Sequence, residues 1–259
     1  MLTQDQKLQF REDGFLLFEE LISGDRLARY VAVFDELVER GRKLQEPEPH
    51  FSLELETDGS PIPGLLHKVQ GVCVVEPRIL ELASEPAILD RVGALLAGGL
   101  GTLGADAYSS DTTIDIFGTK FFPKLPGGGT STHWHQDNYY FGTTSERIIS
   151  CGCYLEPADT DNGCLRVVPG SHRGGGIVEH RQEQGMHGSW TEVDEAAAVD
   201  IIVPGGSVVL FSANLLHGTN DNRSDRSRYS TAWHYVPGDL ALDRFPRAGY
   251  EDRHTVLGV

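Results

Sequence analysis

Apolar residues in the first part of the chain recur mostly three or four positions apart, which is the spacing of one face of an α-helix. This pattern predicts a helix over residues 24–45, and residues 3–12 and 77–97 are also expected to be helical. Short continuous apolar runs predict strands over residues 15–18 and 66–75. The N-terminal part is therefore expected to be mainly helical.

The ends of these elements carry their own signals. Thr3 is a favourable N-cap for the first helix, and Gly14 can adopt the left-handed conformation that commonly ends a helix. Residues 46–65 are rich in Pro, Gly and acidic side chains, so we expect a loop there. A glycine-rich stretch at residues 98–101 should end the third helix.

From about residue 106 the pattern changes to short β-prone runs separated by clusters of Gly, Pro, Asn and Asp. These runs predict strands over residues 112–122, 132–138, 147–155, 164–168, 199–203, 207–212, 215–219 and 228–236. Many short strands with turn-rich joints favour an antiparallel barrel or jelly roll. We expect an α+β fold in one domain over residues 1–259, with a mainly helical flank (1–105) before a jelly-roll core (106–259).

Residues 173–198 interrupt the strand pattern with a glycine-rich start and an alanine-rich end. An insert of this length inside a compact domain is often a lid or binding loop. A simple surface excursion is the alternative, and the sequence leaves both open.

The composition is that of a soluble globular protein, with 39% hydrophobic and 23% charged residues. A formal net charge of −16 disfavours nucleic acid and anionic membranes as partners. No apolar stretch is long enough to span a membrane, and the first residues lack the basic and apolar regions of a secretory signal. We expect a cytoplasmic protein, either a monomer or a homodimer.

The four cysteines do not form a recognisable zinc motif, because the Cys151-x-Cys153 pair has no second pair to complete it. Buried free thiols are the expectation for all of them, namely Cys73, Cys151, Cys153 and Cys164.

The candidate chemistry centres on the sequence His-Trp-His-Gln-Asp at residues 133–137. In a strand, side chains two positions apart point to the same face, so His135 and Asp137 can converge on one ion. Two imidazoles and one carboxylate form the facial triad of non-haem Fe(II) oxygenases. His217, which follows the strand at 207–212, is the preferred third ligand. His133 shares the face of His135, so the spacing leaves it open as an alternative ligand.

Other histidines also compete for a place in the site, namely His172, His187 and His234. Arg228 lies eleven residues after His217, and its planar guanidinium group matches a carboxylate in a bidentate manner. It could hold the distal carboxylate of a dicarboxylic cosubstrate. A surface ion pair with Asp221 or Asp225 is the alternative.

Taken in order, these motifs resemble those of the phytanoyl-CoA dioxygenase family. The resemblance rests on residues 9–15, 135–137, 161–165, 169–172 and 217–219, with Arg228 after them. It implies a double-stranded β-helix, or jelly-roll, fold with flanking N-terminal helices. It also implies an enzyme that uses Fe(II), 2-oxoglutarate and O₂.

The resemblance carries roles over by position. It makes His135, Asp137 and His217 the iron ligands, and it places Arg228 on the distal carboxylate of 2-oxoglutarate. Further cosubstrate-binding candidates are Thr219, Lys68, Lys120 and Gln136. Two positions depart from the family pattern: Lys120 stands where relatives carry an apolar residue, and Gly152 where some relatives carry Trp.

The resemblance also indicates the type of reaction. Related halogenases lack the carboxylate ligand, so Asp137 favours hydroxylation or another oxidation, with release of succinate and CO₂. No basic cluster suited to the phosphates of coenzyme A is visible, which favours a small metabolite as substrate. The substrate-contacting candidates are Gln70, Asn138, Tyr139 and Trp190. The alternatives are a cupin-like metalloenzyme that does not use 2-oxoglutarate and a non-catalytic binding protein on the same barrel.

Overall fold

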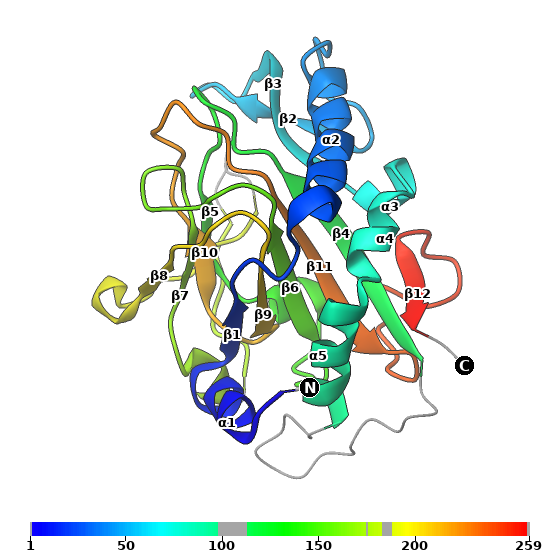
Figure 1. Ribbon diagram of the computed structural model, residues 1–259. Helices are drawn as coiled ribbons and strands as arrows, with labels where there is room; N and C mark the ends of the chain where they lie inside the picture. The colour runs from blue at the N-terminus through cyan, green and yellow to red at the C-terminus, as the bar shows by residue number, and fades with distance from the viewer. Residues whose placement is uncertain (1, 98–112, 175, 183–187, 258–259) are drawn as a thin grey trace.

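The computed structural model describes residues 2–97, 113–174, 176–182 and 188–257 (Figure 1). The helices before residue 98 are α1 (Gln4–Asp13), α2 (Gly24–Gly41), α3 (Val72–Val75), α4 (Ile79–Ala83) and α5 (Pro86–Ala97). The first of these begins and ends as the sequence predicts. The Thr3 side chain accepts a hydrogen bond from the Gln6 backbone, and Gly14 ends the helix with a φ of 86°.

The third predicted helix is wrong as a single element, because α4 and α5 are separated between Ala83 and Pro86. Proline lacks a backbone N–H group and therefore suits the first turn of a new helix. Glu85, in the break, is buried and accepts hydrogen bonds from Tyr30 and Arg26. The predicted stop at residues 98–101 lies outside the described residues.

The loop predicted at residues 46–65 is also wrong, because it contains β2 (Phe51–Leu55) and the start of β3 (Pro61–Gln70). The two strands pair with each other, and the side chains of Phe51 and Leu53 are buried in the core. Acidic residues concealed this strand, since the Glu54 carboxylate is buried and accepts hydrogen bonds from the backbone N–H groups of Gly129 and Thr130. The strand predicted up to residue 75 ends at Gln70 and gives way to α3.

Two antiparallel sheets contain the remaining strands. The larger has the order β1-β9-β6-β11-β4-β3-β2, with β12 also paired to β4. Its other members are β1 (Phe15–Phe18), β4 (Ile114–Phe122), β6 (Ile149–Tyr154), β9 (Ser207–Ser212), β11 (Ser230–Pro237) and β12 (Arg253–Leu257). The smaller has the order β5-β10-β7-β8, from β5 (Thr132–His135), β10 (His217–Thr219), β7 (Leu165–Val167) and β8 (Val199–Ile201).

This arrangement confirms the predicted α+β fold with a jelly-roll core and flanking helices. Among the described residues, strand pairing does not close the two sheets into a continuous barrel. Strand β12 was not predicted. It lies on the edge of β4, where Arg253 donates a hydrogen bond from Nε to the buried Asp115 carboxylate at 3.0 Å.

The helices cover one face of the larger sheet. Figure 1 shows α2, α4 and α5 in front of β4 and β11, and the main apolar core contains residues of α2 and α5 together with residues of the sheet. Phe34 on α2 is fully buried, and its ring centroid lies 4.6 Å from that of Phe121 on β4. The opposite face of the sheet is turned toward the smaller sheet and the candidate site.

The contact between α2 and the sheet gives a stability prediction. Phe34→Ala should lower the free energy of unfolding by about 3–5 kcal/mol, because it removes a fully buried ring and leaves a cavity. Urea denaturation followed by circular dichroism measures this. Leu8→Ala is the control, since Leu8 on α1 is 50% exposed and should change stability by less than about 0.5 kcal/mol. Equal losses in the two variants would contradict the assigned packing.

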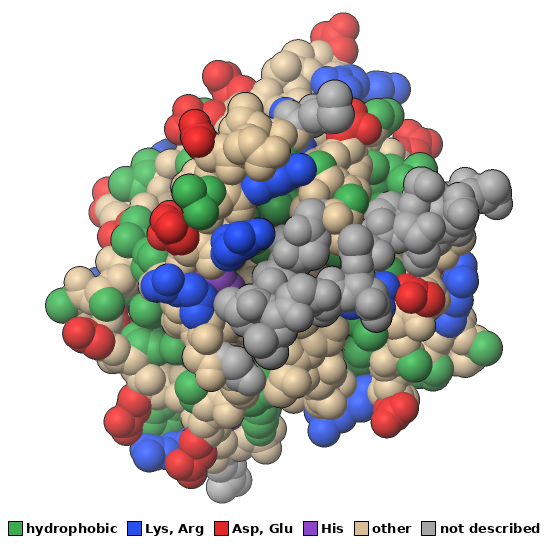
Figure 2. All heavy atoms as spheres, turned by 90° about the horizontal axis from the view of Figure 1, so that it is seen from below, with side chains coloured by type: hydrophobic (Ala, Val, Ile, Leu, Met, Phe, Trp, Pro, Cys, Tyr) green, Lys and Arg blue, Asp and Glu red, His purple; other side chains and the backbone are tan. Residues whose placement is uncertain are grey.

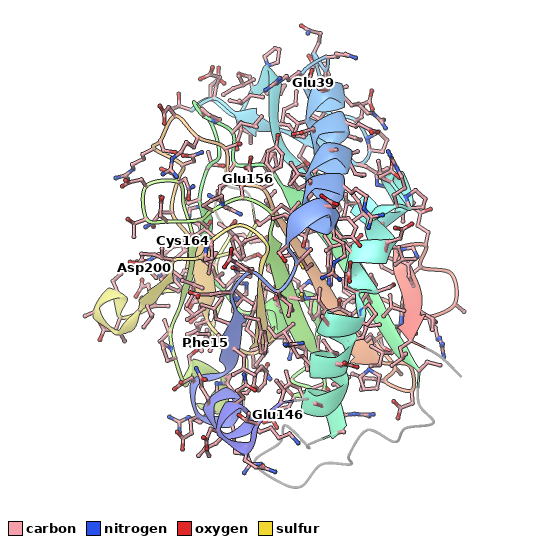
Figure 3. The ribbon with its side chains drawn as sticks, viewed as in Figure 1. Phe15, Glu39, Glu146, Glu156, Cys164 and Asp200 are labelled. Atoms are coloured by element: carbon pink, nitrogen blue, oxygen red, sulfur yellow. The ribbon has the colours of Figure 1, made fainter. Side chains whose placement is uncertain are left out.

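The described cysteines are all free and buried, as predicted, and Cys164 is labelled in Figure 3 next to the start of β7. Figure 2 shows acidic and basic side chains interspersed over the face seen from below. No helix among the described residues is both long and apolar enough to cross a membrane.

Candidate active site

The smaller sheet brings His135 and His217 together, because they are directly paired residues of β5 and β10. The strand predicted at 132–138 ends at His135, and Asp137 begins the short helix α6 (Asp137–Phe141). Gln136 keeps an extended backbone conformation, with φ −113° and ψ 132°. Asp137 therefore remains on the side of His135, as the strand alternation predicted.

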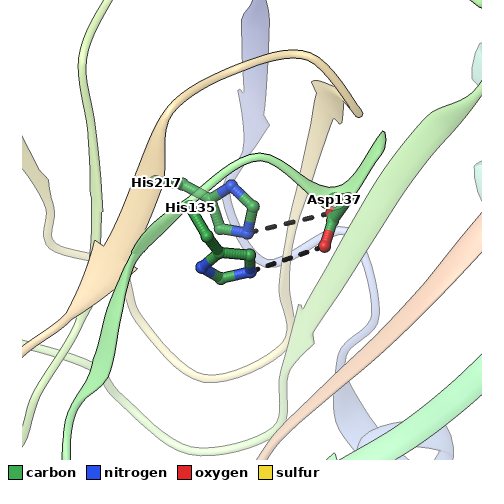
Figure 4. A group of neighbouring side chains, drawn as sticks. All are labelled: His135, Asp137 and His217. Atoms are coloured by element: carbon green, nitrogen blue, oxygen red, sulfur yellow. Dashed lines mark ion pairs between the residues drawn. The ribbon is translucent and has the colours of Figure 1, made fainter. Parts of the chain in front are cut away.

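The three side chains form a compact, buried group. The Nε2 atom of His135 lies 3.6 Å from Oδ1 of Asp137, and Nε2 of His217 lies 3.8 Å from Oδ2 (Figure 4). All three ligand atoms lie within 4.8 Å of one another. Two atoms bound to one transition-metal ion at about 2.1 Å can be separated by at most about 4.2 Å. Both measured separations satisfy this limit.

Each imidazole is oriented in the same way. The Nδ1 atom of His135 contacts the carbonyl oxygen of His133 at 2.7 Å, and that of His217 contacts the carbonyl oxygen of Leu215 at 3.0 Å. A carbonyl oxygen accepts only, so Nδ1 carries the proton and the lone pair of Nε2 faces Asp137. This hydrogen bonding to the second ring nitrogen is typical of metal-bound histidine. The donor set therefore fits a divalent transition-metal ion.

The electrostatics agree with that assignment. Burial, and then the proximity of His135, lower the pKa of His217 to about 4, so its imidazole is neutral at neutral pH. Burial alone would raise the pKa of the Asp137 carboxyl group, but the surrounding His234, His217 and His135 hold it well below its usual value. The group thus combines an ionised carboxylate with a neutral imidazole at His217, which is what metal binding requires.

The competing histidines lie elsewhere. His133 lines the same cavity but is not part of the group of three. The Nε2 atom of His172 contacts the carbonyl oxygen of Arg11 at 3.2 Å, at the end of α1. His234 lies behind Asp137 and contacts the Ser150 hydroxyl group. His187 lies outside the described residues.

A cavity of about 370 Å³ lies between the two sheets and contains the three-residue group. Among its described lining residues, Asp137 is the acidic one, whereas Lys68, Lys120 and Arg228 are basic. Burial, and then the nearby charge of Lys120, lower the pKa of Lys68 to about 8. Burial also lowers the pKa of Lys120, although Asp137 opposes that shift. An excess of buried cations indicates an anionic ligand.

Arg228 carries the clearest sign of such a ligand. It is 1% exposed, its Nε atom has no hydrogen-bond partner, its Nη1 atom donates to the Ser230 hydroxyl, and it forms no ion pair with a described acidic residue. The surface ion pair with Asp221 or Asp225 is not formed. A buried guanidinium group without a counter-ion is costly, so the site fits a bound carboxylate.

The chain on either side of Arg228 is held in place. The Glu156 carboxylate, labelled in Figure 3, accepts hydrogen bonds from the Tyr229 backbone at 2.9 Å and from the Ser227 hydroxyl at 3.0 Å. Thr219 also lines the cavity, and its hydroxyl accepts a hydrogen bond from the Thr132 backbone at 3.0 Å.

The structure separates the remaining candidates. Gln70 lines the cavity, as does Gly152. The other candidates do not line it, namely Gln136, Asn138, Tyr139 and Trp190. The side chain of Asn138 is instead bonded to Ser145 and Asn214.

Tyr140 and Ser189 are lining residues that the sequence analysis missed. The Tyr140 hydroxyl accepts a hydrogen bond from the Ser189 backbone at 2.8 Å, and its ring lies edge-on to that of His135. Ser189 belongs to the insert at 173–198, so the described part of that insert contributes to the cavity wall. This favours a binding segment over a plain surface excursion.

Gln136 attaches the same insert to the site. Its side chain donates to the carbonyl oxygen of Gly176 at 3.2 Å and accepts from the Val178 backbone at 2.9 Å. Its own backbone N–H donates to Nε2 of His180 at 3.0 Å, and the His180 ring stacks on Tyr139 at 4.1 Å. Residues 175 and 183–187 lie outside the described part of the insert.

Comparisons with known proteins agree with this geometry. The family model for phytanoyl-CoA dioxygenase (PhyH) matches residues 10–230. Peroxisomal phytanoyl-CoA dioxygenase of Rattus norvegicus is 26% identical over 251 residues, which cover 92% of this chain and 70% of that protein.

Solved structures show the same fold. EctD from S. alaskensis with bound Fe gives a TM-score of 0.70 at 20% identity, covering 93% of this chain and 79% of that one. EvdO2 from Micromonospora carbonacea var. aurantiaca, complexed with 2-oxoglutarate, gives a TM-score of 0.66 at 22% identity, covering 96% of both chains.

Proposed function

The chain belongs to the phytanoyl-CoA dioxygenase family, and from this premise we propose that it is an Fe(II)- and 2-oxoglutarate-dependent dioxygenase that oxidises a small molecule. One observation carries the proposal: a buried group of two imidazoles and a carboxylate shares its cavity with a buried guanidinium group that lacks a counter-ion. The first part suits Fe(II), and the second suits the distal carboxylate of 2-oxoglutarate.

Each residue has a defined task in this proposal. His135, Asp137 and His217 hold the metal, and Arg228 binds the distal carboxylate, with Thr219 and Lys68 beside it. Fe(II), 2-oxoglutarate and O₂ supply the oxidising chemistry, in which one oxygen atom enters succinate, the other enters the substrate, and CO₂ is released. The protein contributes fixed ligands, an oriented cosubstrate and walls that limit the access of water.

We expect hydroxylation of a small metabolite as the outcome. The cavity volume of about 370 Å³ is at the lower end of the range for small-molecule sites, about 300–1,000 Å³. Gln70, Tyr140 and Ser189 line it and are the residues we expect the substrate to contact.

The test is turnover of 2-oxoglutarate by the purified protein. Succinate should form only when Fe(II), 2-oxoglutarate and O₂ are all present. Under anaerobic conditions, addition of Fe(II) and 2-oxoglutarate should give a weak visible charge-transfer band. A cupin-like enzyme that does not use 2-oxoglutarate would form no succinate, and a non-catalytic binding protein would show neither signal.

The lowered pKa of Lys68 gives a prediction for cosubstrate binding. Lys68 is cationic below about pH 8, and a bound dianion would raise its pKa by stabilising the charged form. Affinity for 2-oxoglutarate should therefore be highest below pH 8. It should fall by up to about tenfold per pH unit above that value, until the pKa of the complex is reached.

Calorimetric titration of the Mn(II)-loaded protein between pH 7 and 9.5 measures this profile. Lys68→Met should bind 2-oxoglutarate more weakly at pH 7 and lose this part of the pH dependence. Lys43→Met is the control, because Lys43 is exposed, and it should behave like the wild type. If Lys68→Met binds 2-oxoglutarate with the same pH dependence as the wild type, Lys68 does not contribute to binding of the cosubstrate.

A further inference from the structure

A row of polar residues crosses the larger sheet on the side of Asp137. Gln70 and Lys120 are directly paired on β3 and β4, and His234 and Ser150 are directly paired on β11 and β6. These strands are consecutive neighbours in the order β6-β11-β4-β3. The row therefore runs across four strands and ends at the carboxylate of Asp137.

The hydrogen bonds along the row all donate toward Asp137. The Nζ atom of Lys120 lies 3.4 Å from Nε2 of His234, and Nδ1 of His234 lies 3.0 Å from the Ser150 hydroxyl. The hydroxyl donates to Oδ2 of Asp137 at 2.6 Å. The carboxylate can only accept, so the Ser150 hydroxyl donates to it and accepts from Nδ1 of His234, which leaves Nε2 of His234 to accept from Lys120. Each group thus donates to the next, from Lys120 to the carboxylate.

We propose that Ser150 and His234, anchored by Lys120, are positioning residues that hold Asp137 in a fixed orientation for metal binding. Ser150 occupies Oδ2, which leaves Oδ1, the oxygen that faces Nε2 of His135, as the one without a hydroxyl donor. The arrangement favours binding of the metal through one carboxylate oxygen. The inference rests on the proposed function, because it concerns the same three-residue group.

Burial makes this hydrogen bond important. Ser150 and His234 are 1% and 2% exposed, so water cannot replace either partner without entering the core. A buried carboxylate that loses a hydrogen bond bears the cost of desolvation without compensation. Groups that orient metal ligands typically contribute about 10–100-fold to metal affinity.

The contacts of Lys120 fit this arrangement. Its Nζ atom donates to the carbonyl oxygen of Gly118 at 3.1 Å and reaches His234 at 3.4 Å. These two contacts hold Nζ of Lys120 beside His234, which in turn contacts the Ser150 hydroxyl that donates to Asp137. In this inference Lys120 acts through His234, and Arg228 and Lys68 bind the cosubstrate.

The test is metal affinity measured without turnover. Calorimetric titration of the metal-free, full-length protein with Mn(II) should show that Ser150→Ala weakens binding by about 10–100-fold. Ser150→Thr, which restores a hydroxyl group, should recover most of the loss. Ser207→Ala is the matched control, because Ser207 is a buried strand serine whose hydroxyl bonds to Pro204, and it should bind Mn(II) like the wild type.

Variants of His234 give a second test of the same inference. His234→Leu should weaken Mn(II) binding, whereas His234→Asn, which retains a donor near the position of Nδ1, should restore part of it. The double variant Ser150→Ala/His234→Leu should bind no more weakly than Ser150→Ala, because both changes interrupt one chain. The visible spectrum of the Co(II)-loaded protein should shift in Ser150→Ala and not in Ser207→Ala.

The outcomes separate this inference from the proposed function. If the wild type binds neither Mn(II) nor Co(II), the metal centre itself is refuted. If the wild type binds and Ser150→Ala binds equally well with an unchanged Co(II) spectrum, only the positioning role is overturned. Additive losses in the double variant would likewise overturn the single-chain arrangement.

Discussion

Asp137→Ala is expected to abolish the Fe(II)-dependent turnover of 2-oxoglutarate. The variant removes the only carboxylate from a group of three ligands, leaving two imidazoles for a divalent ion. Loss of groups that merely orient such ligands costs about 10–100-fold in metal affinity, so loss of the ligand itself should cost more than about 100-fold. His217→Ala should have the same effect, because it removes one of the two imidazoles.

Succinate formation and Mn(II) titration together measure this result. His172→Ala is the control, since His172 contacts the Arg11 backbone at the end of α1 and is not part of the three-residue group. It should retain wild-type turnover and metal affinity. Asp137→Ala also removes the acceptor of the Ser150 hydroxyl group, and with it the indirect contact of His234 with the site. Full activity in either ligand variant would leave the proposed oxygenase without a metal centre.

The metal group could be anticipated from sequence because its key information is local. His135 and Asp137 are two residues apart, and the extended conformation of Gln136 preserves the predicted geometry even though the strand ends at His135. His217 was identified by its place after a strongly apolar strand, and residues 207–212 form that strand as predicted.

The substrate candidate Tyr139 does not line the cavity, whereas its neighbour Tyr140 does. A continuous strand would place Tyr139 on the face of Asp137. The chain instead begins a helix at Asp137, and in a helix the residues three and four positions on share a face. Tyr140 consequently lines the cavity, while Tyr139 stacks on His180. Because the backbone changes from strand to helix at Asp137, the tyrosine that lines the cavity is Tyr140, one residue after Tyr139.

The support behind Asp137 could not be predicted, because the contacts that link Lys120, His234, Ser150 and Asp137 join residues 13 to 114 positions apart. Ser150 lies within an apolar run and reads as an ordinary strand residue, and His234 reads as one of several competing ligands. Only the pairing of β11 with β6 places them side by side. Similarly, the strand at residues 51–55 was hidden because the backbone groups that donate to its one acidic residue, Glu54, lie more than seventy residues away.

Arg228→Ala is expected to raise the dissociation constant for 2-oxoglutarate by at least about 30-fold while leaving Mn(II) affinity nearly unchanged. Removing one partner of a buried, hydrogen-bonded charge pair typically costs about 2–5 kcal/mol, which corresponds to this factor or more. The metal ligands lie on β5, α6 and β10, whereas Arg228 precedes β11, so the centre should persist. Arg228→Lys should be intermediate, because an ammonium group keeps the charge but loses the planar fork.

Cosubstrate selectivity distinguishes this role from a general loss of structure. The wild type should strongly prefer 2-oxoglutarate over 2-oxopentanoate, which keeps the 2-oxo acid group and lacks the distal carboxylate. In Arg228→Ala that preference should largely disappear, because the group that recognises the distal carboxylate is gone. Thermal unfolding of each variant monitors the fold independently. An undiminished preference in a folded, metal-binding Arg228→Ala protein would assign the distal carboxylate to another cation, with Lys68 the next candidate in the cavity.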